Sequence, residues 1–339
     1  MSTREMTDRI KTTVVGSYPV PSWLIGNSSR LVLRDAVMVV LKTQELARLD
    51  LITDGELSRF DPSHPETNGM VDYFVGQMEG IRKRFSMAEL QRFYHDRALA
   101  SRGLPAGMVI GKVEAGTLNL AKDYESVRAL TTSPLKFTCT GPHMLSRVLV
   151  DCHYKERADL AMDIAEILRC QLESVEADVV QLDEANIVGH PEDTAWAAEA
   201  INHVLDGIPN ETAVHVCYGN YGGQTSQRGF WLDLIPFLNK LRADHLVLEF
   251  ARRGYDELEV FRDLNPNIRL GTGVVDIKDN EIESPQLIAT RIESIVTTLG
   301  EKRLKYIHPD CGFWMLHRSV VDRKMHALVE GRDLFEGRP

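Results

Sequence analysis

The sequence predicts an α/β protein, and within that class a (β/α)8 TIM barrel with an insertion after its second strand. Short β-branched runs alternate with longer amphipathic stretches along most of the 339 residues. Eight such runs can be counted, which is the number of parallel strands that closes this barrel. A doubly wound open sheet is the alternative, but no Gly-x-Gly-x-x-Gly motif follows the first run, which argues against its dinucleotide-binding form.

The predicted strands share one feature, because each ends at a turn that contains Gly, Asp or Cys. In chain order they are Thr13–Gly16, Leu51–Asp54, Lys136–Thr140, Asp178–Asp183, Ala213–Cys217, His245–Glu249, Arg269–Val274 and Lys305–His308. Helical periodicity fills most of the intervals between them. These helices are Arg34–Leu49, Lys155–Glu176, Asp193–Leu205, Trp231–Arg242, Glu257–Asp263, Pro285–Leu299 and Val320–Glu330.

Residues 55–134 interrupt the alternation. This segment is too long for a single crossover between a strand and its helix, and it contains an apolar run of its own, Gly107–Val113. We therefore expect an insertion, made of a helix and a hairpin that cover the barrel mouth. No Pro- or Ser-rich linker divides the chain, so residues 1–339 are predicted to form one domain.

Composition and charge narrow the class of function. The chain has 39 Lys and Arg against 49 Asp and Glu, for a net charge of −10, and no dense basic run. This argues against binding to nucleic acid or to an anionic membrane surface. No apolar run approaches the ~20 residues of a membrane span, and the first residues lack the apolar core of a secretory signal. Five scattered cysteines are typical of free thiols or metal ligands, so we expect a soluble, cytoplasmic enzyme or binding protein.

The strongest chemical signal is a group of metal-ligand residues at strand ends. His215 and Cys217 alternate along one strand and therefore project to the same side. By themselves they are more typical of a buried histidine beside a small buried cysteine. Cys311 follows the last strand in a Pro/Gly turn, and Glu249 closes an apolar strand where a carboxylate is costly to bury without a partner. Together these four residues would suit tetrahedral zinc.

A second group of strand-end residues is acidic. Asp183 and Glu184 follow one strand, and Asp54 and Glu56 follow another. They could bind a substrate ammonium group, and the alternatives are loop solvation or capping of a helix N-terminus. Among these acids, we expect Asp183 and Glu56 above all to bind the substrate.

Two weaker signals lie close to predicted strand ends. The turn Gly16–Ser17 offers backbone N–H groups and a hydroxyl that suit a carboxylate, although such turns are common. Cys139 lies in a strand close to the expected barrel mouth, which makes it a rival metal ligand.

Taken together, these motifs resemble the catalytic half of cobalamin-independent methionine synthase over nearly the whole chain. The resemblance rests on segments spread along the sequence: Thr12–Pro19, Thr53–Glu56, Asn68–Phe74, Thr140–Leu145, Val180–Asn186, His215–Tyr218, Leu246–Glu249, Gly273–Ile277 and His308–Gly312. It implies a zinc site made of His215, Cys217, Glu249 and Cys311 on a (β/α)8 barrel. It also implies a homocysteine site made of Gly16, Ser17, Glu56 and Asp183.

The resemblance further implies a reaction. Zinc would convert the homocysteine thiol into a thiolate at neutral pH, and the thiolate would take a methyl group directly to give methionine. The family's Asp-Ile-His element reads Asp276-Ile277-Lys278 here, so Lys278 replaces a histidine proposed to assist the leaving group. The methyl donor is left open between methyltetrahydrofolate and a methyl-corrinoid or corrinoid protein, whose leaving group is better. Lys278, His143, His308 and His317 are all open as the general acid.

Two other functions remain as alternatives. Relatives with a single barrel include epoxyalkane:coenzyme M transferases, in which a thiol opens an epoxide and a sulfonate takes the place of the amino acid. Arg59, Arg252 or Arg253 would then bind the sulfonate. In the second alternative, zinc is purely structural and the barrel only binds a ligand. Zinc ligands at strand ends argue against this, since residues there line the active-site mouth of such barrels.

Overall fold

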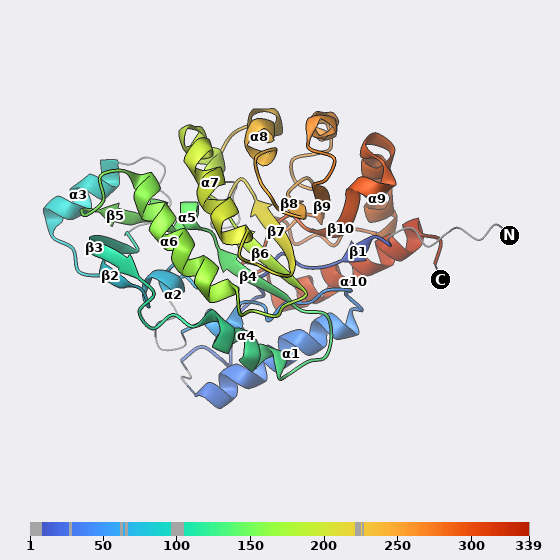
Figure 1. The fold of residues 1–339 in the computed structure, drawn as a ribbon. Coiled ribbons are helices and arrows are strands. Elements are labelled where there is room, and N and C mark those ends of the chain that lie inside the picture. The colour runs from blue at the N-terminus through green and yellow to red at the C-terminus, as the bar shows by residue number, and fades with distance from the viewer. Residues whose placement is uncertain are drawn as a thin grey trace.

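The computed structural model contains a parallel barrel surrounded by helices (Figure 1). It describes residues 9–26, 29–61, 64, 67–95, 105–220, 225 and 227–338. The extra stretch between Glu56 and Asn68 lies partly outside these residues. No helix in the described parts of the chain is long and apolar enough to cross a membrane.

Seven parallel strands form the main sheet, in the order β1-β10-β9-β8-β7-β6-β4. Their bounds are Lys11–Thr12 (β1), Lys136–Thr140 (β4), Val179–Asp183 (β6), Glu211–Val216 (β7), His245–Leu248 (β8), Arg269–Val275 (β9) and Leu304–Pro309 (β10). Two parallel bridges, Thr13 to Leu51 and Ile52 to Leu135, join the two outer strands. Residues 51 and 52 therefore take the place of an eighth strand, and the predicted barrel is confirmed.

The second predicted strand, Leu51–Asp54, is shorter than expected. Its pairing ends at Ile52 because side chains take the next backbone groups. The Gln44 amide accepts from the N–H of Thr53 at 3.0 Å and donates to its carbonyl at 2.7 Å. Further along, the Arg59 guanidinium donates to the carbonyl of Thr138 in β4. Side chains thus replace a strand ladder at this seam of the barrel.

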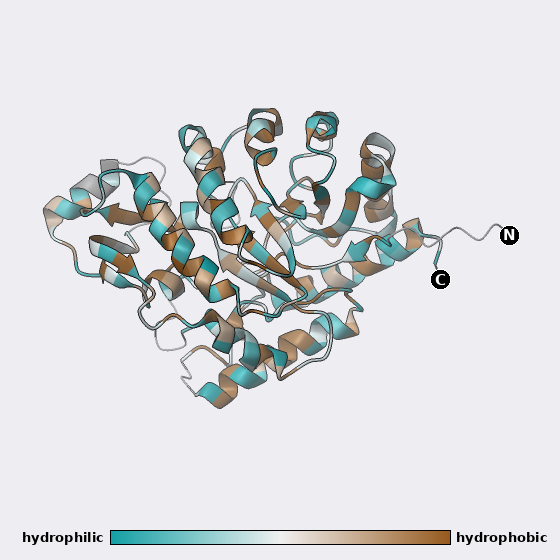
Figure 2. Cartoon of the chain, viewed as in Figure 1, coloured by the Kyte–Doolittle hydropathy of each residue, from teal (hydrophilic) through white to brown (hydrophobic). Residues whose placement is uncertain are grey.

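Helices cover the outside of the barrel, and the polar and apolar residues alternate along them (Figure 2). The helices that alternate with the strands are α1 (Arg30–Leu46), α5 (Pro142–Arg147), α6 (Arg157–Leu172), α7 (Thr194–Leu205), α8 (Trp231–Leu238), α9 (Pro285–Leu299) and α10 (Arg318–Phe335). The predicted helix at Glu257–Asp263 is instead a 3-10 helix, η5 (Leu258–Asp263). Short 3-10 helices also occur at Leu57–Arg59 (η1), Ile187–Gly189 (η3), Pro191–Asp193 (η4) and Glu301–Arg303 (η6).

The segment after the second strand contains most of a small second sheet. Its elements are α2 (Asp72–Val75), β2 (Glu79–Arg82), α3 (Met87–His95), β3 (Gly107–Glu114) and α4 (Leu120–Arg128). Strands β2 and β3 pair antiparallel, and β3 also pairs with β5 (Leu149–Asp151), which follows α5. This sheet and α3 lie to one side of the barrel (Figure 1).

Two hydrophobic clusters show which way the strand side chains point. The larger cluster joins strands to helices. The smaller one takes a residue from each of six strand positions, and its members are Val15, Leu51, Val179, Ala213, Val247 and Tyr306. Because alternate residues share a face, Asp183, His215 and Glu249 follow Val179, Ala213 and Val247 on the inner side. The carboxyl ends of these strands thus place polar side chains on the inner face of the barrel.

Candidate metal and substrate site

Three predicted metal ligands lie together at the carboxyl end of the barrel. One ligand atom each from His215, Cys217 and Cys311 falls within 4.8 Å of the other two. The Cys311 Sγ is 3.7 Å from the His215 Nε2. His215 and Cys217 are buried and Cys311 is partly exposed, so the group has one side toward solvent. β7 supplies the first residue, its following loop the second, and the loop after β10 the third.

Hydrogen bonding prepares His215 to bind a cation. Its Nδ1 lies 2.9 Å from the carbonyl oxygen of Val247 in the neighbouring strand. A carbonyl only accepts, so Nδ1 carries the proton and the lone pair is on Nε2, which faces Cys311. Hydrogen bonding to Cys217 is the largest cause that raises the pKa of the Cys311 thiol well above its ordinary value. Two thiols and an imidazole this close therefore favour a bound cation, which would take the place of their protons.

Glu249 does not belong to this close group, because it lies beside Lys278. Its side chain is fully buried, and neither carboxylate oxygen has a hydrogen-bond partner among the described residues. The Lys278 Nζ is 3.6 Å from one oxygen, and this ammonium also has no hydrogen-bond partner in the described chain. Burial raises the pKa of Glu249, while Lys278 and His215 act to lower it. A buried carboxylate without hydrogen bonds is a fitting ligand for a cation.

Asp310, which sequence reasoning did not single out, connects two ligand loops. It precedes Cys311, and its carboxylate accepts from the backbone N–H groups of Phe250, Ala251 and Arg252 at 2.9, 2.8 and 2.7 Å. These groups follow Glu249 directly. The loops after β8 and β10 are therefore fixed relative to each other by one fully buried side chain.

The two acids predicted to bind substrate also line the inner face. Asp183 is the register partner of His215 across β6 and β7, so the acid is next to the metal ligands. It is 3% exposed. Burial raises the pKa of Glu56 to about 7; the charge of Arg59 lowers this pKa and that of Asp183 raises it. Two neighbouring carboxylates, Asp183 buried and Glu56 partly exposed, form a site that would bind an ammonium group.

The Gly16–Ser17 turn lies against both parts of the site. A Cβ at Gly16 would fall 2.2 Å from the Glu56 Oε1, so only glycine leaves room for this carboxylate. A Cβ at Gly312 would fall 2.0 Å from the Ser17 Oγ, and the N–H of Phe313 donates to the Ser17 carbonyl at 2.9 Å. The turn thus packs between Glu56 and the loop that contains Cys311.

Each of the two acids accepts a hydrogen bond from a polar side chain on an inner strand face. The Thr138 hydroxyl donates to Glu56 at 2.9 Å, and the Gln181 amide donates to Asp183 at 2.7 Å. Glu56 also has a left-handed backbone, with φ of 60°. Such conformations cost energy and are frequent at functional sites.

None of the three arginines proposed for a sulfonate is an open anion site. Arg59 is 6% exposed and bonds both the carbonyl and the hydroxyl of Thr138. Arg252 pairs with Asp276 at 3.1 Å near the surface. Arg253 pairs with Glu257 at 2.7 Å and lies over the ring of Tyr218. These contacts do not favour the coenzyme M alternative.

Other residues considered from the sequence have structural surroundings. Asp54 accepts from the N–H of Glu56 at 2.9 Å and from Ser58, and so forms the turn. Glu184 accepts from the N–H groups of His143 and Met144 at 3.0 and 2.8 Å, which caps α5. Cys139 lies outside the close group of ligands found in the described chain.

His308 and His317, two of the candidates for the general acid, differ in their burial. His308 is fully buried inside the barrel, and burial lowers its pKa to about 3. His317 is exposed immediately before α10.

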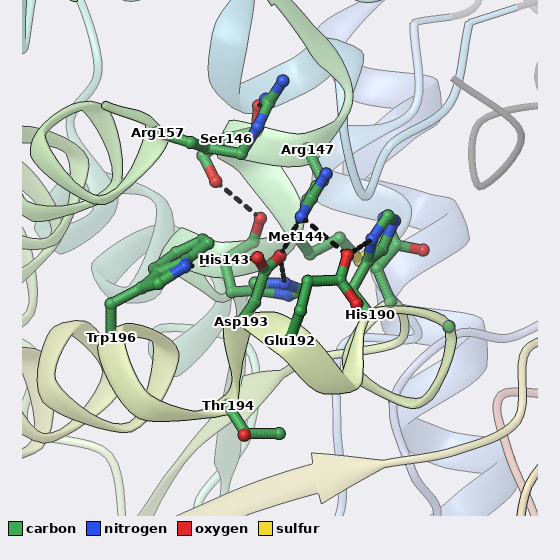
Figure 3. A network of polar contacts seen from close by, with 12 residues as sticks. His143, Met144, Ser146, Arg147, Arg157, His190, Glu192, Asp193, Thr194 and Trp196 are labelled. Atoms are coloured by element: carbon green, nitrogen blue, oxygen red, sulfur yellow. Dashed lines mark hydrogen bonds and ion pairs between the residues drawn. The ribbon is translucent and has the colours of Figure 1, made fainter. Parts of the chain in front are cut away.

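A second polar network lies around His143, beside the barrel (Figure 3). Its Nε2 is 2.9 Å from Asp193 Oδ2, and Arg147 Nε donates to the same oxygen at 2.6 Å. Burial opposes ionisation of Asp193, but the bonds from His143 and Arg147 outweigh it and lower the pKa to about 2. Asp193 also clusters with His190 and Glu192. Because the Arg147 guanidinium already supplies a cation to this carboxylate, we assign the network a structural role.

Sequence reasoning missed Thr138, Gln181 and Asp310. The first two are polar residues at inward positions of barrel strands, where apolar residues are expected. That departure from the strand pattern could have identified them. Asp310 lies inside the Pro-Asp-Cys-Gly motif, but no pattern in the sequence indicates which backbone groups it accepts from.

Comparison with known proteins agrees with this architecture. The family model described as "Cobalamin-independent synthase, Catalytic domain" matches residues 10–332. The methionine synthase of Sulfurisphaera tokodaii is 29% identical, with 95% of this chain and 91% of that protein covered. That of Thermococcus kodakarensis is 28% identical, with coverages of 96% and 93%.

Solved structures of two bacterial proteins share the fold. A B12-independent methionine synthase from Shewanella sp. W3-18-1, in complex with selenomethionine, has a TM-score of 0.80 at 23% identity and covers 97% of this chain and 98% of that one. A putative vitamin-B12-independent methionine synthase from Listeria monocytogenes has a TM-score of 0.68 at 17% identity, with the same coverages. The chain therefore belongs to the cobalamin-independent synthase family, as a methyltransferase of the methionine synthase type.

Proposed function

We propose that this protein is a zinc-dependent thiol methyltransferase that converts homocysteine into methionine. One arrangement carries the proposal. His215, Cys217 and Cys311 converge within 4.8 Å, and Asp183 is the register partner of His215. A metal site for a thiol and an acidic site for an ammonium group are thus side by side, as an amino acid with a thiol side chain requires.

The donor set favours zinc among divalent cations. One imidazole and two thiolates are the nitrogen and sulfur ligands typical of zinc, and the buried Glu249 carboxylate is available as a fourth. When bound, such a cation lowers the pKa of a coordinated thiol so that it is ionised at neutral pH. The three ligands closest together leave one tetrahedral position to Glu249 or to a substrate, and a carboxylate is the ligand of this set that a thiolate would most readily displace.

The chain's own side chains would orient the amino acid. Glu56 and Asp183 bind its ammonium group, and the Gly16–Ser17 turn offers N–H and hydroxyl donors to its carboxylate. Held this way, the sulfur faces the methyl donor. A new sulfur–carbon bond forms as the bond from the methyl carbon to its leaving atom breaks, and the leaving group takes that electron pair. A buried, water-poor site increases the electrostatic part of this orientation.

Lys278 is our candidate for protonation of the leaving group. Its ammonium is 3.6 Å from Glu249 and therefore close to the site. Lys278→Met should lower kcat for methyl transfer and leave the affinity for homocysteine unchanged. Unchanged kcat in a folded Lys278→Met protein would remove Lys278 from this role.

The methyl donor is the second substrate. Because the family is described as cobalamin-independent, methyltetrahydrofolate is the donor we favour, and nothing in the comparisons supports a corrinoid. Parallel assays with methyltetrahydrofolate and with methylcobalamin would decide between them. Methionine formed only from methylcobalamin would reverse the choice of donor and keep the thiol chemistry.

The central experiment tests the thiol. Cobalt-substituted protein is titrated with homocysteine and, separately, with coenzyme M, and sulfur-to-metal absorption is recorded. We expect a new band with homocysteine alone. A band with coenzyme M alone would contradict the proposed substrate and favour epoxide opening. If neither thiol gives a band in folded, metal-loaded protein, the proposal is wrong.

A further inference from the structure

Lys136 is a buried lysine inside the barrel. It begins β4 and is 2% exposed. Its ammonium donates to the carbonyl of Val14 at 2.5 Å and to the side-chain oxygen of Gln181 at 2.8 Å. Burial of an ammonium is costly, and a barrel interior rarely contains one without a reason. Burial lowers the pKa of Lys136 to about 7, although Asp183 and Glu56 act to raise it.

Lys136 contacts the oxygen end of the Gln181 amide. A glutamine side chain has an oxygen and a nitrogen end that could exchange places, but the Val15 carbonyl on its other side can only accept a hydrogen bond. The nitrogen end must therefore face Val15, and the oxygen end faces Lys136. The nitrogen end then faces the other way and donates to the Val15 carbonyl at 3.0 Å and to the Asp183 carboxylate at 2.7 Å.

The side chains of Lys136, Gln181 and Asp183 follow one another along the inner wall of the barrel. Gln181 and Asp183 are alternate residues of β6 and share its inner face, and Thr138 of β4 is the register partner of Gln181. These side chains are all 3% exposed or less. Water therefore does not substitute readily for a lost partner, and removal of Lys136 leaves the oxygen of Gln181 unpaired.

We propose that Lys136 is a positioning residue of the substrate site: through Gln181 it orients the Asp183 carboxylate toward the ammonium group of the substrate. The inference rests on the proposed ammonium site. Its consequence is a preference for thiols that carry an amino group over thiols that lack one. Lys136 does not touch the substrate, so its effect passes through the Gln181 amide.

The test measures thiol binding without any methyl donor. Cobalt-loaded wild-type, Lys136→Met and Lys136→Arg proteins are titrated with homocysteine and with 4-sulfanylbutanoate, which lacks only the amino group. Loss of one hydrogen bond to a charged group predicts that Lys136→Met raises the Kd for homocysteine about tenfold or more. The Kd for 4-sulfanylbutanoate should stay within about twofold, and Lys136→Arg, which still donates, should recover part of the preference.

Controls separate this inference from the proposed function. Thr272→Val removes a buried hydroxyl of β9 that has no hydrogen-bond partner in the described chain, and should change neither Kd. Equal affinity of the wild type for both thiols would overturn the ammonium site itself. A wild-type preference that persists in Lys136→Met would overturn the role of Lys136 alone, as would an equal loss for both thiols. If Lys136→Met does not fold, the same criteria apply to Gln181→Met.

Discussion

A single methyl group at Gly16 should disturb amino-acid binding and leave the metal ligands in place. In Gly16→Ala the new Cβ would lie 2.2 Å from the Glu56 Oε1 and 3.2 Å from the Thr138 Cγ2. Ordinary contact begins at 3.4 Å, so the carboxylate must move by about 1 Å. The backbone of Glu56 is held in a left-handed turn by Asp54, which leaves the side chain as the part that moves.

The size of the effect follows from the contact that the movement breaks. Glu56 accepts from the Thr138 hydroxyl at 2.9 Å, and a displacement of about 1 Å exceeds hydrogen-bond range. A hydrogen bond to a charged group contributes about 1.5–3 kcal/mol. If the same misplacement applies to the ammonium contact, the KM for homocysteine should rise roughly ten- to a hundredfold.

Steady-state methyl transfer with homocysteine and with 4-sulfanylbutanoate would measure this effect. Metal content of the purified protein is determined in parallel, and it should equal that of the wild type. Gly111→Ala is the matched control, because a Cβ there has no atom within 4 Å. An unchanged KM for homocysteine in folded Gly16→Ala, or an equal rise for both thiols, would refute the role assigned to Glu56.

Three more predictions address separate parts of the molecule. Cys311→Ser should lose bound metal, measured by mass spectrometry, and thiol methylation, while the far-ultraviolet circular dichroism of the barrel remains; full activity without metal would contradict the site. Asp183→Asn should raise the KM for homocysteine far more than that for 4-sulfanylbutanoate, and equal effects would exclude an ammonium contact. Asp193→Asn should lower the free energy of unfolding at pH 7 by about 2 kcal/mol, since a pKa of about 2 in place of 3.8 favours the folded, ionised state. That stabilisation is complete above the ordinary pKa and is lost as the pH falls through about 2. The difference in urea unfolding between the two proteins should therefore start to shrink below about pH 4 and disappear only below about pH 2; a constant difference would contradict the ion-pair origin.

The sequence was informative where a short-range pattern determines geometry. Strand alternation places His215 and Cys217 on one side, and the barrel brings the loop of Cys311 to the same end. Residues of this kind could be identified because their chemistry is unusual for their positions. The sequence could not show that Glu249 lies beside Lys278 instead of within the close group, since that depends on where two side chains from different strands point.

Two departures from the expected secondary structure also depend on contacts between side chains and distant backbone groups. The second strand was expected to extend to Asp54, but the Gln44 amide takes the hydrogen bonds of Thr53, and strand propensity does not indicate that a side chain will replace a strand partner. The helix expected at residues 257–263 is a 3-10 helix, which has nearly the same apolar spacing over so short a length. Contacts through Asp310 and Lys136 join segments far apart in sequence, and they became visible only in three dimensions.

Beside β4, side chains replace the hydrogen bonds of a strand ladder, and this has a consequence for how substrate specificity can evolve. The strand that contains His215 and the strand that precedes Cys311 each have a hydrogen-bonded neighbour on both sides. Glu56, in contrast, follows residues 51 and 52, which pair with their neighbours through only two isolated bridges in the described chain. The long segment after the second strand position begins there. If the proposed function holds, mutations in that segment can alter how Glu56 contacts the substrate amine, while Asp183 and the proposed metal ligands lie in or just after strands that are paired on both sides. Part of the thiol specificity can therefore change without a new catalytic centre.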